Sequence, residues 1–402
     1  MGTHTRGSLS AACLRIWGEM TKLALEQSPA LATESKSSGR RAHEQRELTL
    51  VLAFSFIAFW ATVFLAHRST GLVLEYGDNS AYLDVARAIL HWNLQKAPMQ
   101  HFMGFPYFIA GASRLFHLPP GFCLWAIAVV SSAVSVWITA QLFGVVVAAY
   151  FALTNFAWIQ VSFLGGSEPL SMALGLGALL AFRRGRVSLA AVLGAIAVTV
   201  RPLMIFVLVG IGLVLLYRRQ WRSLAAALGI GLGVGLVYAM PLYRYFGDPL
   251  LTVHTYTTRD YGAVRIVGPH GRLFGWPFHG IVAGTLAYPA PWTNLVLSFF
   301  WIGLVLAGIA MMFSSRFRRY GREHPNEVVF CGLYLLAVFS YDYLIWARSN
   351  FIRFSIPALP FVFLSLLPLL PRSRWFVWSL CLVSALLAAL SAVGWRTVAG
   401  VH

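Results

Sequence analysis

The chain has 402 residues, of which 58% are hydrophobic and 11% are charged, and its formal net charge is +17. A typical soluble domain is about 25% charged, and a soluble chain of this length divides into domains joined by polar linkers. No such linker follows residue 47. The composition therefore excludes a soluble enzyme, a disordered protein and a secreted disulfide-bonded scaffold, and predicts an all-α polytopic membrane protein embedded in the lipid bilayer.

The excess of basic residues is concentrated in short arginine-rich clusters between apolar runs. These clusters lie at 183–186, 218–222, 316–319 and 372–374. Short basic loops that flank apolar spans mark the cytoplasmic side of a membrane protein. The positive charge therefore indicates topology, and we expect no nucleic-acid partner.

Residues 1–47 are mixed polar and form a predicted cytoplasmic tail. A bilayer crossing needs about 20 mostly apolar residues, and the first such stretch is 48–66. Four basic residues precede it, which places the N-terminus in the cytoplasm. They are Lys36, Arg40, Arg41 and Arg46. Residues 48–402 then form one multi-spanning domain.

The first predicted outer loop, about 67–101, contains the pattern of a helix on the membrane surface. Apolar residues recur at i, i+3, i+4, i+7 and i+8 from Tyr82, which is typical of one buried helix face. Asp78 or Ser80 is well placed to cap this helix. A second outer loop, about 244–292, is rich in Gly, Pro, His and aromatic residues, which suit a membrane interface or a ligand groove.

Three apolar segments, 102–117, 121–140 and 143–163, lie between the first outer loop and Glu168, which is also on the outer side. Two outer positions require an even number of crossings between them. One segment is therefore expected to be re-entrant or interfacial, and the sequence leaves open which one.

Residues 187–217 lie between two basic clusters and predict a pair of short crossings with Arg201 at their outer tip. Further crossings are expected at 168–182, 223–243, 293–313, 328–346, 355–370 and 375–395, for a total of about eleven. Four glycines fall inside one of these crossings, where small residues typically pack against another helix. They are Gly229, Gly231, Gly233 and Gly235.

Seven acidic residues lie outside the tail and the inner loops and are candidates for chemistry. They are Glu75, Asp78, Asp84, Glu168, Asp248, Asp260 and Asp342. Carboxylates gathered on one side of a membrane protein indicate a functional site. Simpler alternatives exist: Asp78 as a helix cap, Asp84 as a water-facing residue, and Asp342 as a hydrogen-bond partner for a neighbouring helix. Glu323 and Glu327 lie in an inner loop, where solvation or charge balance explains them.

Two arginines on the outer side have no role as cytoplasmic anchors. Arg201 and Arg353 each lie next to an apolar span, and an arginine at such a place normally pairs with an anion. A guanidinium makes bidentate contacts with phosphate. The alternative is an ion pair with Glu168 or Asp342.

The second outer loop supplies Asp248, His254 and Arg259 as candidate contacts for an acceptor. Asp248 is equally typical of a turn, and Arg259 of a solvated side chain. The histidines of this loop lack the fixed spacing of a metal site.

Five stretches with a common outer side carry a family resemblance. They are Asp78-x-x-x-Tyr82-Leu83-x-x-Ala86, Ser167-Glu168-Pro169-Leu170, Ala197-Val198-Thr199-Val200-Arg201-Pro202, Phe246-Gly247-Asp248-Pro249-Leu250 and Arg353-Phe354-x-Ile356-Pro357-x-Leu359-Pro360. In this order they resemble the GT-C superfamily, multi-spanning glycosyltransferases that use polyprenyl-phosphate-linked sugars, and the fourth is similar to GPI-mannosyltransferase-like members and their bacterial relatives. The resemblance covers about 48–370 and implies a GT-C-like helical bundle with two extracytoplasmic loops.

The resemblance implies an inverting transfer of a sugar, a hexose such as mannose, from a polyprenyl-phosphate donor to a lipid or glycan acceptor at the outer face of a bacterial inner membrane. Asp78 would be the general base, and Glu168 would orient the acceptor or help to hold a divalent cation. Arg201 and Arg353 would stabilise the departing phosphate. Many members carry paired acids in the first motif, whereas this chain has Asn79, which leaves a requirement for Mg²⁺ or Mn²⁺ open.

Two other functions are compatible with the same residues. A transporter or flippase of lipid-linked sugar would use the outer arginines without a catalytic base. A catalytically silent subunit would keep Asp78 and Glu168 far apart. Asp78, Glu168 and Arg353 lying together would favour the enzyme.

Overall fold

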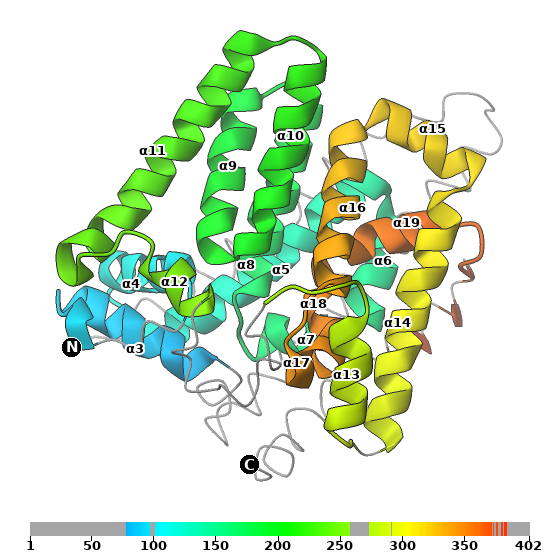
Figure 1. Ribbon diagram of the computed structural model, residues 1–402, viewed down its shortest axis with the longest axis horizontal. Coiled ribbons are helices and arrows are strands. Elements are labelled where there is room, and N and C mark those ends of the chain that lie inside the picture. Colours follow the sequence, from blue (N-terminus) through cyan, green and yellow to red (C-terminus); the bar gives the residue numbers. More distant parts are fainter. Residues whose placement is uncertain are drawn as a thin grey trace, which may run out of the picture.

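The computed structural model describes residues 78–96, 101–257, 273–290 and 292–371, together with residues 373, 375, 376, 379, 380, 382 and 383. These parts of the chain are helical, with one isolated β-bridge between Phe274 and Tyr341 (Figure 1). The predicted all-α fold is therefore confirmed. The predicted tail at 1–47 and the first crossing at 48–66 lie outside the described residues, as does most of the last crossing at 375–395.

Among the described residues, three helices are long and apolar enough to cross a bilayer. They are α5 (Pro120–Phe143), α11 (Trp221–Phe246) and α14 (Trp292–Met312). A fourth crossing results if α6 (Val145–Thr154) and α7 (Phe156–Phe163), which meet at a bend of 83°, count as one broken span. Shorter apolar helices accompany them, and the total of about eleven crossings stays a prediction.

The segment around Arg201 folds as the sequence predicts. Helix α8 (Glu168–Arg183) is followed by α9 (Val187–Val200), the short η3 (Pro202–Met204) and α10 (Ile205–Tyr217). Arg201 has extended backbone angles, φ −143° and ψ 120°, and so ends α9. Proline is favoured at the first position of a helix, so the residue after Arg201 starts the next turn. Arg201 therefore lies at the tip of two short helices.

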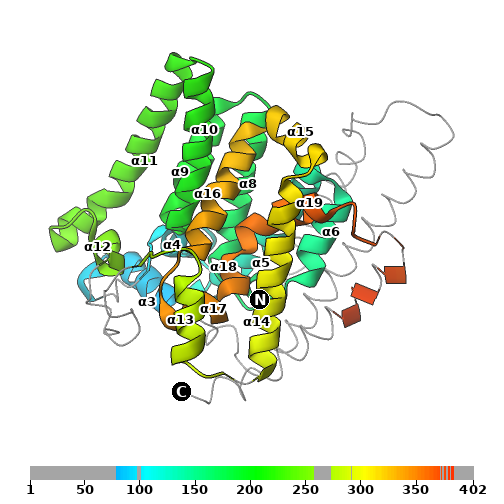
Figure 2. The ribbon, with the colours of Figure 1, turned by 45° about the vertical axis from the view of Figure 1, so that its right-hand side comes forward.

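The arginine-rich turns gather at one end of the molecule, which we call the basic end. This end comprises the α8–α9 turn, the α10–α11 turn and α15 (Ser315–Glu323), which joins α14 to α16 (Pro325–Phe339). Figures 1 and 2 show the α10–α11 turn and α15 at the top of the molecule. The opposite end, which we call the α3 end, comprises α3 (Asn79–Leu90), α12 (Leu251–Thr257) and α13 (His279–Ala287).

Helix α4 (Gly104–Phe116) is the first of the three apolar segments before Glu168. It has 13 residues, about 20 Å of helix, and is much shorter than α5. Its buried Phe105 and Ile109 pack with Tyr82 of α3 and with residues of α5, α8 and α9 that lie at the α3 end. At Gly104 a side chain would collide with the backbone of Thr199. The segment 102–117 therefore packs at the α3 end. The bent pair α6–α7 fits either a broken span or a re-entrant loop, so the choice among the three segments stays a prediction.

The predicted role of the glycines in α11 is wrong for the described residues. A Cβ atom added at any of the four would meet nothing within 4 Å. Helix α11 runs along the outside of the bundle (Figure 1), and its buried residue is Leu242, near its end. The glycine face therefore packs against no described helix.

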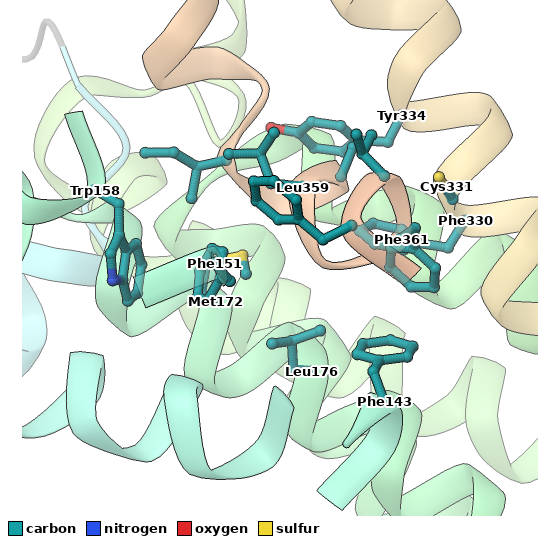
Figure 3. Close-up of a cluster of buried hydrophobic side chains, with 14 of the residues drawn as sticks. Phe143, Phe151, Trp158, Met172, Leu176, Phe330, Cys331, Tyr334, Leu359 and Phe361 are labelled. Carbon is teal, nitrogen blue, oxygen red and sulfur yellow. The ribbon is translucent and has the colours of Figure 1, made fainter. Parts of the chain in front are cut away.

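A core of buried hydrophobic side chains joins α5, α16 and α19 (Figure 3). Phe361 of α19 (Leu359–Leu366) lies with its ring 4.9 Å from that of Phe143 and 5.8 Å from that of Phe330. Such pairs contribute about 0.5–1.5 kcal/mol each beyond their buried area. They fix α16 and α19, between which the chain forms three short helices. These are α17 (Leu344–Ser349), α18 (Phe351–Phe354) and η4 (Ile356–Ala358).

Candidate active site

Four charged residues singled out in the sequence meet at the α3 end. Asp78 stands at the N-cap of α3 and Glu168 at the first position of α8. Arg201 lies between α9 and η3, and Arg353 lies in α18. The positions farthest apart in the chain, Asp78 and Arg353, are 275 residues apart and hydrogen-bonded to each other. The fold therefore brings together the residues predicted as base, acceptor contact and phosphate ligands.

Glu168 is the centre of this cluster and is only 2% exposed. Its Oε1 atom accepts a hydrogen bond from Arg353 Nε and forms an ion pair with Arg201 Nη1. Both predicted phosphate ligands therefore pair with Glu168, which is the alternative considered from the sequence. A buried carboxylate requires such partners, because an uncompensated charge in the interior is costly.

The second carboxylate oxygen of Glu168 makes fewer polar contacts than the first. Oε2 is buried and has no hydrogen-bond partner among the described residues. The Cβ position of Gly166 lies 2.8 Å from this oxygen, so a side chain at residue 166 would collide with it. Close backbone approach is a typical use of glycine. Since buried polar atoms are nearly always satisfied, Oε2 is a vacant acceptor in the middle of the cluster.

The side chain of Asp78 contacts charged residues of the cluster and does not cap α3 through a hydrogen bond. It occupies the N-cap of α3 but makes no side-chain capping hydrogen bond. Instead its Oδ2 accepts a hydrogen bond of 3.4 Å from Arg353 Nη2, and its Oδ1 lies 3.8 Å from His101 Nε2. The Asp78 side chain is 39% exposed. Arg353 thus bridges a buried carboxylate and a more accessible one.

The sequence analysis missed His101, which completes the cluster. Its side chain is 14% exposed, and its ring centroid lies 5.1 Å from that of Tyr82. Burial lowers the pKa of His101 below its usual value, and the positive charges of Arg353 and Arg201 act in the same direction, whereas Asp78 and Glu168 oppose it. The sequence pattern indicated candidate histidines only in the second outer loop. The signal in the sequence that could have identified His101 is its position shortly before the short helix α4.

Two tyrosines and an asparagine hold the cluster in place. The Tyr82 and Ser167 hydroxyls are hydrogen-bonded at 3.1 Å, which ties α3 to the start of α8. Asn79 is buried and donates to the Leu164 carbonyl oxygen at 3.0 Å. Tyr334 of α16, also buried, donates to the carbonyl oxygen of Phe354 at 3.1 Å and so supports α18. Asn79, the departure from the family motif, therefore supports the backbone that leads into Glu168.

The candidates from the second outer loop do not join this cluster. Asp248 and His254 pair with each other at 2.7 Å, and Asp248 also accepts a hydrogen bond from the backbone of Leu250 at 2.9 Å. The hydrogen bond with His254 lowers the pKa of Asp248. This is the turn chemistry considered as the alternative. Arg259 lies outside the described residues.

Two further acidic candidates, Asp84 and Asp342, form the ion pairs or hydrogen bonds given as their alternatives, whereas Glu75 and Asp260 lie outside the described residues. Asp84 forms an exposed pair with Arg87 at 3.0 Å. Asp342 pairs with His279 of α13 at 2.6 Å. Neither pair includes a member of the cluster around Glu168.

The described residues do not fit a divalent cation at the cluster. They contain no group of three or more His, Cys, Asp or Glu residues that could hold a metal ion. The two carboxylates, Asp78 and Glu168, are joined through the guanidinium of Arg353, so a cation between them would meet a positive charge. No step below uses a metal.

No protein-family model matches the chain, and no curated protein matches it. Among solved structures, the chain is similar to the crystal structure of ArnT from Cupriavidus metallidurans bound to undecaprenyl phosphate, with a TM-score of 0.50 and 16% identity over 83% of this chain and 62% of that one. The apo structure of the same ArnT has a TM-score of 0.45 and 17% identity over 92% of this chain and 66% of that one.

The likeness to the lipid-bound structure concerns the fold. The chain spans about three fifths of the length of that ArnT. The helical architecture agrees with the fold expected from the sequence, and the long apolar helices agree with a protein embedded in a bilayer. The chain is therefore an integral membrane protein with the GT-C-like helical fold.

Proposed function

We propose that the chain is a glycosyltransferase that moves a sugar from a polyprenyl-phosphate donor to a hydroxyl group of a lipid or glycan acceptor, with inversion at the anomeric carbon. The observation that carries this proposal is the pair of arginines, Arg201 and Arg353, held on one oxygen of Glu168 beside the more accessible Asp78. The similar ArnT structure contains undecaprenyl phosphate, a ligand of the proposed donor class.

Asp78 is the better general base of the two carboxylates. Glu168 is buried and shares its charge with two guanidinium groups, whereas Asp78 is 39% exposed and has one arginine contact, of 3.4 Å. Asp78 takes the proton of the acceptor hydroxyl as the oxygen attacks the anomeric carbon. The bond from that carbon to the phosphate oxygen breaks, and its electron pair leaves with the phosphate. Such a base contributes typically about 10²–10⁴-fold.

The two arginines stabilise the charge that develops on the departing phosphate. Preorganised donors of this kind are often the largest catalytic contribution, and guanidinium groups match phosphate oxygens in geometry. Glu168 positions both guanidinium groups by pairing them on Oε1. Its vacant Oε2 accepts a hydrogen bond from a substrate hydroxyl, which gives Glu168 a second role in orienting the acceptor.

Transfer is expected to proceed without Mg²⁺ or Mn²⁺, because Arg353 occupies the space between the carboxylates that a cation would use. Transfer rates measured with EDTA, and after adding back each cation, check this expectation. A loss of more than about tenfold that Mg²⁺ or Mn²⁺ restores would contradict it.

The proposal places the reaction at the α3 end, on the outer face of a bacterial inner membrane with the N-terminus in the cytoplasm, and names a hexose such as mannose as the first donor sugar to test. The adjacency of Asp78, Glu168 and Arg353 is unlike the arrangement expected of a silent subunit. A carrier of lipid-linked sugar would use the same arginines, and the experiment must distinguish it from an enzyme.

The test is transfer of label from a radiolabelled polyprenyl-phosphate sugar in proteoliposomes that contain the wild type, Asp78→Asn or Arg353→Ala. The matched control is Asp84→Asn, which changes an exposed carboxylate on the same helix. Label that reaches an acceptor with the wild type and the control, and falls at least about 10²-fold with the two site variants, supports the enzyme. Label that crosses the bilayer on the intact lipid with both the wild type and Asp78→Asn identifies a carrier.

A further inference from the structure

We propose that α15, at the basic end, is a docking surface for the headgroups of anionic phospholipids and that a buried ion pair holds it in position for this purpose. The surface is formed by four exposed arginines on this helix. They are Arg316, Arg318, Arg319 and Arg322. The proposal concerns the end of the molecule opposite to the candidate active site and does not depend on the proposed transfer reaction.

The position of α15 fits the headgroup layer of a bilayer. The long apolar helix α14 ends at Met312, and α16 begins at Pro325, so α15 connects two apolar helices at the level where both reach the surface. Phe313, immediately after α14, is 75% exposed. Aromatic side chains at such a junction are typical of the membrane interface.

The helix divides cleanly into an inward and an outward face. Phe317 is buried and Tyr320 is half-buried, and these residues lie three positions apart on the inward face. All four arginines lie on the remaining, exposed surface. Glu323 is the acidic residue on this surface, and its contact with Arg319 is 3.8 Å between exposed side chains, which contributes little. The outward face therefore carries a net positive charge.

Hydrogen bonds of Tyr320 and a capping hydrogen bond of Ser314 hold the nine-residue helix α15 in place. Tyr320 accepts a hydrogen bond of 2.9 Å from Arg183 Nη2 and donates one to Glu327 Oε2. The Ser314 hydroxyl caps the first turn by accepting a hydrogen bond from the Phe317 backbone at 3.3 Å. A helix of this length is marginal alone in water. These contacts therefore display the arginines at fixed positions, whereas arginines in a turn are held less firmly.

A lipid surface fits this display better than a nucleic acid does. The exposed aromatic residue Phe313 lies two positions before the start of α15. Arginines next to exposed apolar side chains match the boundary between phosphate groups and acyl chains. Anionic lipids attract basic segments there by about fivefold in affinity for each arginine.

The test is the binding of phosphatidylglycerol and of phosphatidylcholine to the purified full chain in detergent micelles, measured by native mass spectrometry. One variant replaces the four α15 arginines by glutamine. The matched control replaces four exposed arginines in the other turns of the basic end. These are Arg184, Arg186, Arg218 and Arg219.

The wild type is expected to retain phosphatidylglycerol in preference to phosphatidylcholine. The α15 variant is expected to lose about 25-fold or more in affinity for phosphatidylglycerol, as two or more contacts disappear, and the control less than about fivefold. Equal losses in the two variants would show that net charge, not α15, attracts the lipid, and would overturn the proposal. Equal retention of both lipids by the wild type would do the same.

A third variant, Tyr320→Phe, tests whether the hydrogen bonds of the Tyr320 hydroxyl contribute to lipid binding by α15. It keeps every arginine and removes the hydroxyl that joins α15 to Arg183 and Glu327. A loss of about threefold or more in phosphatidylglycerol affinity is expected if display at fixed positions contributes. Affinity equal to that of the wild type would overturn this part of the proposal.

Discussion

Each end of the molecule holds a buried glutamate paired with arginine, but the two pairs are built differently. At the basic end, both oxygens of Glu327 are used: Arg183 Nε contacts Oε1 at 3.0 Å, and Arg183 Nη2 contacts Oε2 at 2.8 Å. The third nitrogen of Arg183, Nη1, donates to the Leu142 carbonyl oxygen at 2.9 Å, and Tyr320 bonds to both partners. At the α3 end, one oxygen of Glu168 serves two arginines and the other serves none among the described residues.

Under the proposed function, the difference separates a structural site from a functional one. A buried ion pair whose donors and acceptors are all satisfied has no capacity left for a ligand, and breaking it leaves an uncompensated charge. A cluster with a vacant acceptor and a long contact to a half-exposed carboxylate keeps polar groups available for substrate. Perturbed, incompletely satisfied charges in one place are typical of functional sites.

The largest effect on stability is expected from Glu327→Gln. The variant removes the charged partner of Arg183 and is expected to lower the free energy of unfolding by about 3 kcal/mol, because the partly buried guanidinium loses its counter-charge. The unfolding midpoint of the purified protein measures this loss. Glu323→Gln, which breaks an exposed contact four residues earlier, is the control and should change the stability by less than about 0.5 kcal/mol. Similar midpoints for the two variants would contradict a structural role for the buried pair.

At the α3 end, Arg353→Lys is expected to affect activity more than stability. Lysine keeps the charge but cannot bridge Asp78 and Glu168 with two nitrogens. Transfer should fall by about 10²–10³-fold, while Arg201 still pairs with Glu168 and limits the loss of stability. The transfer rate and the unfolding midpoint are measured on the same preparation, with Arg87→Lys as the control. The contrary outcome is that Arg353→Lys loses as much stability as Glu327→Gln while its folded fraction transfers sugar at the wild-type rate. That result would show that the cluster at the α3 end is structural rather than catalytic.

A smaller, pH-dependent effect is expected from His101. Burial lowers its pKa in the folded protein, so the unfolded chain binds more protons as the pH falls below about 6.5, and stability is lost in that range. Arg201 and Arg353 disfavour the added proton, whereas Asp78 and Glu168 favour it. The unfolding midpoint of the wild type should therefore fall more steeply between pH 7 and pH 5.5 than that of His101→Gln. Parallel curves for the two proteins would contradict this contribution.

The smallest effect is expected from Asp84→Asn. Asp84 and Arg87 form an exposed pair on α3, and such pairs contribute about 0–1 kcal/mol. The unfolding midpoint and the transfer rate should both stay close to those of the wild type. A loss of activity comparable to that of Asp78→Asn would show that the cluster extends further along α3.

The sequence was sufficient to predict the positions of residues that depend on their neighbours in the chain or on the membrane topology. Arg201 could be placed at an outer tip because it lies between two basic clusters, and the N-cap position of Asp78 followed from the helix pattern after it. Glu327 was assigned to solvation or charge balance, yet it is fully buried. Its partner Arg183 lies 144 positions away in the chain, and nothing in the local sequence indicates that the two would meet.

Two other features required the folded structure for the same reason. His101 joins the cluster only because α4 packs at the α3 end, an arrangement fixed by packing between Gly104 and Thr199. The glycines of α11 have the spacing of a packing face, whereas the described helices leave that face uncovered.

The charges of the cluster around Glu168 cancel, since Asp78 and Glu168 are balanced by Arg201 and Arg353. Under the proposed function, the donor is a phosphodiester with one negative charge, and the spent carrier is a monoester that carries about −1.5 to −2 at neutral pH. The same arginines therefore hold the product more tightly than the donor. Added polyprenyl phosphate is therefore expected to act as a product inhibitor that competes with the donor.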